Sequence, residues 1–151
     1  MKLSICIPTY NRANYLNNCL HSIINCNHNK ATKFQVCVSD NCSTDNTEFV
    51  VKKAAKFLKI KYMKNTFNIG VHLNFLNVVS MADTEFVWML GDDDLLMPYA
   101  IEKIFNLIEK NQNVDFFYVN SYHLSTEYVD KFSNPFNTKN LPVDMQPFSR
   151  R

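Results

Sequence analysis

Short apolar runs alternate along the chain with stretches in which apolar residues recur at helical spacing. The short runs have the length of buried strands and fall at residues 3–7, 34–38, 60–63, 85–90 and 115–119. The helical spacing between them predicts helices within residues 15–24, 45–58, 71–82 and 98–108. Strands and helices in this order predict an α/β fold with a mostly parallel sheet. The near-continuous apolar character of the first, second and fourth runs predicts burial on both sheet faces.

Finer features of the pattern predict how the helices begin and which side they bury. Asp45 and Glu48 have the spacing of a capping box, and Pro98 suits the first turn of the fourth helix. The helix faces expected to pack on the sheet carry Phe49, Ala54, Phe57, Leu58, Val71, Phe75, Val78, Val79, Ala82, Ile101, Ile104, Phe105 and Ile108.

From about His123 the periodicity fades, and Pro135, Pro142 and Pro147 interrupt a polar tail. We therefore expect one domain over residues 1–122 and a weakly patterned tail over residues 123–151. The tail is either a loosely packed extension or the beginning of a further segment that has been cut off.

Composition narrows the classes of function. With 151 residues, of which 46% are hydrophobic, the chain suits one compact domain with a sizeable core. The net charge of +2 gives no electrostatic case for nucleic acid, although a weakly basic patch remains compatible with phosphates or a lipid surface. Five cysteines without CxxC spacing argue against zinc and a disulfide framework and favour a reducing cytoplasm. No run reaches membrane-spanning length, so we expect a cytoplasmic protein and leave peripheral contact with the inner face of a membrane open.

Polar residues follow the first four apolar runs directly. In an open parallel sheet, ligands bind outside the carboxyl ends of the strands. The sequence therefore predicts that four loops converge at one sheet edge, carrying residues 8–12, Asp40, residues 68–70 and residues 92–94.

The three consecutive aspartates Asp92, Asp93 and Asp94 are the most informative feature. Carboxylates this close repel one another, and a hard divalent cation is a fitting compensator. Mg²⁺ and Mn²⁺ take one or two carboxylates and fill the other positions with water and substrate phosphate. The alternative is a solvated turn that caps the next helix. The position of the aspartates after a buried strand favours the metal.

The other candidates each have an ordinary alternative. Asp40 suits a hydrogen bond from a base edge or a turn, Thr9 and Tyr10 suit a cradle for a planar base, and Arg12 suits a diphosphate or solvent. Gly70 marks a close approach or a positive φ. We interpret the isolated side chains that remain as packing or surface residues: Cys42, His72 and His123.

Four ordered motifs together resemble the family 2 glycosyltransferases, which have the GT-A fold. They are residues 4–12 (SICIPTYNR), 38–47 (VSDNCSTDNT), 68–70 (NIG) and 88–94 (WMLGDDD). The resemblance covers roughly residues 2–122 and identifies the chain as the nucleotide-sugar-binding portion of such an enzyme. It implies transfer of a sugar from a nucleoside-diphosphate sugar to an acceptor hydroxyl, in bacterial surface glycan synthesis, with a glycan or lipid-linked acceptor.

By this resemblance, the base and diphosphate are held by Pro8, Thr9, Tyr10, Arg12, Asp40, Asn68 and Gly70. Asp92 faces the ribose, Asp93 is the principal ligand of Mn²⁺ or Mg²⁺, and Asp94 assists or caps. Many members have aspartate where Gly91 stands and glycine where Cys42 stands, which predicts altered ligand geometry and an altered turn.

Inverting members carry a general base well beyond the metal motif. None of Asp115, Asp130 and Asp144 matches it, so the catalytic base stays unassigned. The rival class is a non-catalytic nucleotide-sugar-binding module. A sugar nucleotidyltransferase needs a loop rich in glycine and in lysine or arginine after the first strand, and a Rossmann dehydrogenase needs GxGxxG there; residues 8–12 form neither.

Overall fold

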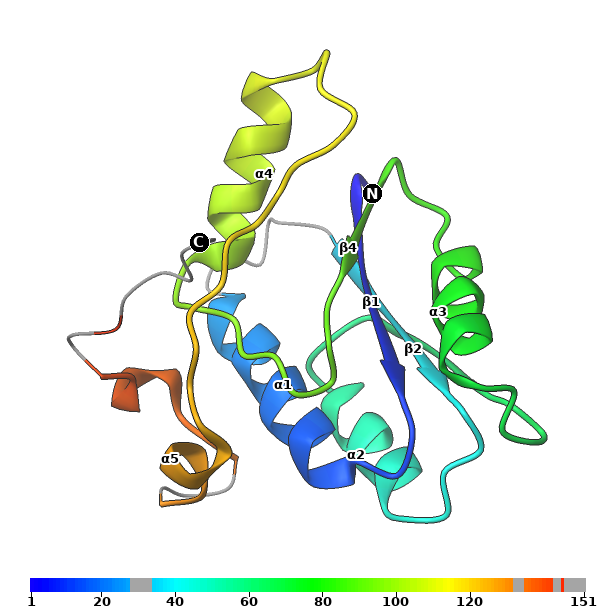
Figure 1. Cartoon of the computed structure of the whole chain (residues 1–151). Helices are drawn as coiled ribbons and strands as arrows, with labels where there is room; N and C mark the ends of the chain where they lie inside the picture. Colours follow the sequence, from blue (N-terminus) through cyan, green and yellow to red (C-terminus); the bar gives the residue numbers. More distant parts are fainter. Residues whose placement is uncertain (28–33, 132–134, 143–144, 146–151) are drawn as a thin grey trace.

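The computed structural model describes residues 1–27, 34–131, 135–142 and 145. Its four strands run parallel in one sheet of order β3-β2-β1-β4 (Figure 1). Their bounds are β1 (Leu3–Thr9), β2 (Phe34–Asp40), β3 (Ile60–Lys64) and β4 (Phe86–Met89). In the β1–β2 register Thr9 lies opposite Asp40, so the carboxyl ends of the central strands meet at one edge. The predicted α/β class is confirmed.

Helices cover both faces of the sheet (Figure 1). One face carries α1 (Ala13–Cys26), α2 (Thr47–Ala54) and α4 (Ala100–Lys110), and the other carries α3 (Val71–Ser80). The larger core lies under α1, where Ile5, Ile7 and Leu20 are fully buried. A smaller core under α3 consists of Cys6, Cys37, Val78 and Met81. The predicted two-sided covering is confirmed.

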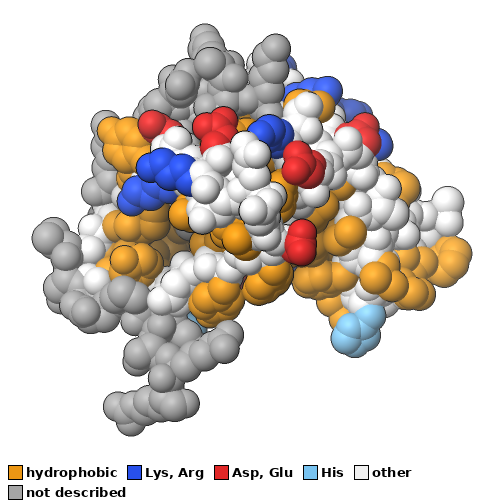
Figure 2. Space-filling view, turned by 90° about the horizontal axis from the view of Figure 1, so that it is seen from above, with side chains coloured by type: hydrophobic (Ala, Val, Ile, Leu, Met, Phe, Trp, Pro, Cys, Tyr) orange, Lys and Arg blue, Asp and Glu red, His pale blue; other side chains and the backbone are white. Residues whose placement is uncertain are grey.

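Helix α3 packs on the sheet through a different line of residues from the predicted one. Asn74 and Val78 are buried, whereas Val71, Phe75 and Val79 are exposed, which corrects the expectation for those three. The physical reason is polar: Asn74 Nδ2 donates to Ser39 O at 3.0 Å and Asn74 Oδ1 accepts from Ser39 Oγ at 2.7 Å, so the amide takes the inward position. The helix contains no Asp, Glu, Lys or Arg, and Figure 2 shows hydrophobic surface on this side, at the right of the view.

The start of α2 also differs from the prediction. Asp45 Oδ1 accepts from Thr47 N at 3.1 Å, but Glu48 pairs with Lys52 at 2.6 Å instead of closing a capping box. Phe49 and Phe57 are 68% and 66% exposed, so their predicted packing was wrong. The inward line of this short helix passes through its buried residues Thr47, Val51 and Ala54, and Leu58 beyond its end is buried too.

The edge of the sheet beside β4 holds two further corrections. Val87 and Met89 are exposed on one side of β4, because α3 packs on β1 and β2. Residues 115–119 form no strand; Phe117 contacts the ring of Phe86 at a centroid distance of 6.0 Å, but Phe116 is 80% exposed. A side-chain contact thus replaces the predicted strand pairing.

Helix α4 buries the predicted apolar face. Ile101 and Ile108 are buried, and Ile104 and Phe105 pack partly against the core. The helix begins at Ala100, so Pro98 precedes it and does not occupy its first turn. The reason is local: Tyr99, at the N-cap, has the left-handed φ of 64°.

The tail contains α5 (Thr126–Asp130) and a short 3₁₀ helix, η1 (Thr138–Asn140). Phe136 is buried, and its backbone N–H donates to Asn18 Oδ1 of α1 at 2.8 Å. Within the described ranges, the helices are all too short or too polar to cross a membrane. The division at residue 122 stays a prediction.

Candidate functional site

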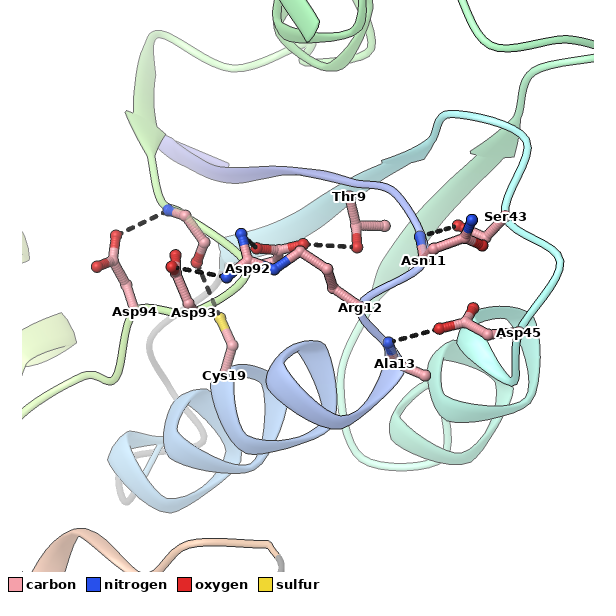
Figure 3. A network of polar contacts seen from close by, with 11 residues as sticks. Thr9, Asn11, Arg12, Ala13, Cys19, Ser43, Asp45, Asp92, Asp93 and Asp94 are labelled. Atoms are coloured by element: carbon pink, nitrogen blue, oxygen red, sulfur yellow. Dashed lines mark hydrogen bonds and ion pairs between the residues drawn. The ribbon is translucent and has the colours of Figure 1, made fainter. Parts of the chain in front are cut away.

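A cleft of about 370 Å³ lies at the carboxyl ends of β1, β2 and β4. Most of the side chains singled out in the sequence line it, from three separate loops. The lining residues are Pro8, Thr9, Tyr10, Arg12, Asn41, Asn68, Val71, Asn74, Phe75, Gly91, Asp92 and Asp93. The predicted convergence of loops at this sheet edge is therefore present, and Figure 3 shows its acidic side.

Asp92 is the buried carboxylate of the cleft, with its side chain 6% exposed. Its Oδ2 accepts from Thr9 Oγ1 at 2.8 Å, and its Oδ1 lies 3.1 Å from Arg12 Nη1 (Figure 3). Burial raises the pKa of Asp92 above its ordinary value, although Thr9 and Arg12 act in the opposite direction. Arg12 is thus the cation that faces this buried carboxylate.

Asp93 is half exposed, and its Oδ2 accepts from Arg12 Nη2 at 2.8 Å. One guanidinium thus bridges both aspartates, and its carbon lies 4.7 Å from the centre of the Tyr15 ring. Partial burial opposes the charge of Arg12, but the hydrogen bond to Asp93 and the nearby charge of Asp92 raise its pKa above the ordinary value. The sequence left open whether Arg12 binds a diphosphate or lies in solvent. In the structure its guanidinium pairs with the two carboxylates.

Asp94 closes the loop that presents the other two aspartates. Its Oδ2 accepts from Gly91 N at 2.8 Å, and its own N–H donates to Gly91 O at 3.1 Å. A Cβ on Gly91 would lie 2.8 Å from Asp93 Oδ1 and 3.0 Å from Asp94 Oδ2. A side chain at this position, where many family members have aspartate, would therefore have to move the carboxylate ends of Asp93 and Asp94. These contacts hold the loop and cap no helix, and the role predicted for Asp94, assisting the metal or capping, stays a prediction.

The acidic loop suits a divalent cation by its chemistry. Among the residues that the structure describes, no three His, Cys, Asp or Glu side chains form a ready ligand set. Asp92 and Asp93 nevertheless offer hard oxygen ligands in a cleft, and Mg²⁺ needs only one or two carboxylates when substrate phosphate and water complete its shell. The donor set therefore fits Mg²⁺ or Mn²⁺ bound together with a phosphate ligand.

Asp40 lies beneath the cleft with no exposed surface. Its Oδ1 accepts from Ser43 N at 2.8 Å and its Oδ2 from Tyr62 OH at 2.7 Å. Burial, together with this hydrogen bond to Asp40, raises the pKa of Tyr62. Tyr62 was not singled out in the sequence, because its position in β3 suggests only packing. The contact of Asp40 with a base stays a prediction.

An amide network forms the floor of the cleft next to Asp40. Asn41 Nδ2 donates to Asn68 Oδ1 at 2.8 Å, and Asn41 Oδ1 accepts from Ile69 N at 2.9 Å. Asn68 Oδ1 also accepts from Gly70 N at 2.8 Å. Gly70 has a φ of 84° and a ψ of 159°, and a Cβ there would meet nothing within 4 Å, so its backbone conformation is what requires glycine. The predicted positive φ is confirmed.

Two loops are tied to each other at the rim. Asn11 N donates to Ser43 Oγ at 2.8 Å and Ala13 N donates to Asp45 Oδ2 at 2.9 Å (Figure 3). Thr44 N also donates to Asn11 Oδ1 at 2.8 Å. Cys42 has a φ of 69°, the left-handed conformation that glycine adopts freely. Cysteine is thus held here in a conformation that suits glycine, and the expectation of an altered turn stays a prediction.

Sequence reasoning missed the cleft residues contributed by α3. Val71 and Phe75 were expected to pack inward and instead border the cleft, and Asn74 was not considered. The available signal was an asparagine at the centre of an uncharged helical segment that follows a glycine.

Comparison with known proteins shows which family the chain resembles. The family model described as "Glycosyl transferase family 2" matches residues 4–148. The abequosyltransferase RfbV of Salmonella typhimurium is 41% identical over 102 residues, covering 64% of this chain and 29% of that protein. The poly(ribitol-phosphate) β-N-acetylglucosaminyltransferase TarP of Staphylococcus aureus is 31% identical over 115 residues, covering 74% of this chain and 34% of that protein.

Solved structures agree with the sequence matches. The structure of S. aureus TarS in complex with UDP-GlcNAc superimposes with a TM-score of 0.68 and 29% identity, covering 74% of this chain and 32% of that one. The chain spans about a third of the length of these relatives.

Proposed function

Because the chain belongs to glycosyl transferase family 2, we propose that it forms the donor-binding part of an enzyme that transfers a sugar from a nucleoside-diphosphate sugar to an acceptor hydroxyl. The observation that carries this proposal is the position of Asp92 and Asp93 in one cleft with Tyr10, at the carboxyl ends of the strands. The complex of the related TarS with UDP-GlcNAc supports a nucleotide-sugar donor.

Each cleft residue has a proposed part in donor binding. The half-exposed ring of Tyr10 stacks on the planar base, and the amide of Asn68 and the backbone at Gly70 bound the base and ribose. Thr9 orients Asp92 through its hydroxyl, so that the carboxylate faces the ribose and the diphosphate. The predicted base contact of Asp40 acts from beneath, within the bonds to Ser43 and Tyr62.

Asp92 and Asp93 are the proposed ligands of Mn²⁺ or Mg²⁺, with Asp94 holding their loop. When bound, the cation neutralises the negative charge that develops on the departing nucleoside diphosphate. Arg12, in the same cleft, is the proposed protein cation for the diphosphate.

A general base for the acceptor hydroxyl would be a carboxylate near the cleft. The carboxylates that line the cleft are those of Asp92 and Asp93, and both are paired with Arg12. Asp115 and Asp130 are not among the lining residues, and Asp144 lies outside the described residues. We leave the general base unassigned. TarP, named for poly(ribitol-phosphate), supports a bacterial surface glycan as the acceptor. A cytoplasmic location, with or without membrane contact, stays a prediction.

Calorimetry tests the donor site directly. We expect the chain to bind one of UDP, GDP, CDP and dTDP more tightly with Mn²⁺ than without it. Asp93→Asn should weaken the metal-dependent binding by about tenfold or more, because one of two protein ligands loses its charge. Asp115→Asn, the same change at an exposed position, is the matched control. Nucleotide binding that is independent of Mn²⁺ and unchanged in Asp93→Asn would overturn the assigned role.

A non-catalytic nucleotide-sugar-binding module is the second candidate. It is favoured by the pairing of both cleft carboxylates with Arg12, which leaves the lining residues of the cleft without an unpaired carboxylate base. Incubating the chain with the donor that calorimetry identifies, and following release of the nucleoside diphosphate, separates the two. Donor turnover above that of the Asp93→Asn variant supports the enzyme, and binding without turnover supports the module.

A further inference from the structure

We propose that Arg12 is an internal counter-cation that couples metal binding to nucleotide binding: it holds Asp92 and Asp93 together until a divalent cation replaces it, and then pairs with the diphosphate. The inference rests on the proposed function, because it concerns the order and mutual dependence of the two ligands at the same cleft.

The bridging geometry is the first support. Arg12 Nη1 lies 3.1 Å from Asp92 Oδ1 and Arg12 Nη2 lies 2.8 Å from Asp93 Oδ2, so one planar group contacts both carboxylates. The other Asp92 oxygen accepts from Thr9. Both Asp92 oxygens are thus engaged, so a cation ligated by Asp92 has to displace the guanidinium from Asp92 Oδ1. Metal binding and this bridge therefore compete.

The exposure of the partners indicates which group moves. The side chain of Asp92 is 6% exposed and is fixed by Thr9, whereas the side chain of Arg12 is 41% exposed. Arg12 occupies the N-cap of α1 without a side-chain capping bond, so rotating its side chain breaks no contact that the helix start depends on. Displacement of Arg12 thus leaves the backbone of the cleft unchanged.

The released guanidinium stays within the cleft. In its bridging position the guanidinium lies 4.7 Å from the centre of the Tyr15 ring, and Arg12 lines the same cleft as Tyr10 and Asn68, so a short rotation of the side chain keeps it there. A planar guanidinium pairs well with phosphate oxygens through two parallel hydrogen bonds. A diphosphate in the cleft thus offers Arg12 a new anion when the cation takes the carboxylates.

The formal charges in the cleft predict how the cation and the diphosphate affect each other's binding. Asp92, Asp93 and Arg12 together carry one negative charge, which repels a diphosphate. A divalent cation alone has to displace the bridge, and a diphosphate alone meets this negative charge. With both ligands present, the cation compensates the carboxylates and Arg12 compensates the phosphates. Each ligand should therefore strengthen binding of the other, and the enhancement is necessarily reciprocal.

The test measures Mn²⁺ binding by electron paramagnetic resonance and UDP binding by calorimetry, each with and without the other ligand. In the unaltered chain we expect mutual enhancement of about 5–150-fold, the usual range for coupled sites. In Arg12→Gln, Mn²⁺ alone should bind about tenfold more tightly, because no bridge has to be displaced, and the enhancement should fall about tenfold. Lys52→Gln, which removes the same charge from exposed α2, should behave as the unaltered chain.

Arg12→Lys provides a second variant if the glutamine variant folds poorly. It keeps the charge but loses the planar bridge, so Mn²⁺ alone should bind more tightly while UDP retains part of its enhancement. The inference is overturned if both Arg12 variants bind Mn²⁺ alone no more tightly than the unaltered chain and keep its enhancement. If the unaltered chain binds neither Mn²⁺ nor any of the four nucleotides, the proposed function itself fails.

Discussion

Replacing Tyr62 by phenylalanine removes one hydroxyl group and keeps the ring. In the folded chain that hydroxyl donates to Asp40 Oδ2 at 2.7 Å, and Asp40 has no exposed surface. The variant therefore leaves a buried carboxylate with the single remaining bond from Ser43 N. We expect the free energy of unfolding to fall, because water reaches the unpaired oxygen only in the unfolded chain.

The magnitude follows from the charge and burial of Asp40. A hydrogen bond to an ionised group contributes about 1.5–3 kcal/mol, and the upper part of that range applies to a group with no exposed surface. We take about 2 kcal/mol. For a domain of this size, each kcal/mol lowers the melting temperature by about 2–4 °C, so Tyr62→Phe should melt about 4–8 °C lower.

Urea and thermal unfolding, followed by circular dichroism at pH 7, measure the loss. Tyr122→Phe, at an exposed tyrosine, is the matched control and should change the stability by less than about 0.5 kcal/mol. Asp40→Asn alone and combined with Tyr62→Phe completes a double-mutant cycle that isolates the pair. Equal effects of Tyr62→Phe and Tyr122→Phe, or an interaction energy near zero, would refute the argument.

Three further changes test the loops around the cleft by urea unfolding. Cys42→Gly should raise the free energy of unfolding by about 1 kcal/mol, since glycine adopts the φ of 69° without strain. Cys42→Ala keeps the Cβ and is the control; if it is as stable as Cys42→Gly or more stable, the explanation from backbone strain is contradicted. Gly70→Ala should lower it by about 1–3 kcal/mol, because its φ of 84° and ψ of 159° suit glycine alone; a neutral result would count against the described backbone. Asp45→Asn should cost about 1 kcal/mol at pH 7. Burial opposes the charge of Asp45, but hydrogen bonds from Thr47 and Ala13 lower its pKa below the ordinary value, so its contribution should shrink as the pH falls below about 4 toward that lower pKa. A stability difference between the unaltered chain and Asp45→Asn that does not shrink on acidification would be inconsistent with this.

The fold was predictable from the sequence where the buried side chains are apolar. The runs at β1 and β2 are apolar and fully buried, so their pattern fixed the centre of the sheet. The apolar pattern failed where a polar side chain is buried for its hydrogen bonds. Asn74 faces the sheet because it pairs with Ser39, and this rotates the helix so that Val71 and Phe75 point outward.

The sequence predicted which residues line the cleft, but it did not predict most of the contacts between them. The rule that ligands bind beyond the carboxyl ends of parallel strands brought Thr9, Tyr10 and Asp92 together correctly. The pairing of Arg12 with Asp93, 81 residues away, depends on how the helix α1 starts and on the turn at Gly91. Neither is encoded in a local pattern, and the same holds for Tyr62 and its bond to Asp40.

The strand order has a consequence for biosynthesis. β1 leaves the ribosome before β4, yet β4 is one of its two neighbours, and their register places Leu3 opposite Phe86. During synthesis β1 thus keeps one backbone edge unpaired until β4 has been translated. Parallel pairing over such sequence separation is slow to form. A nascent chain stalled before residue 86 should therefore expose the unpaired backbone edge of β1, to which chaperones can bind.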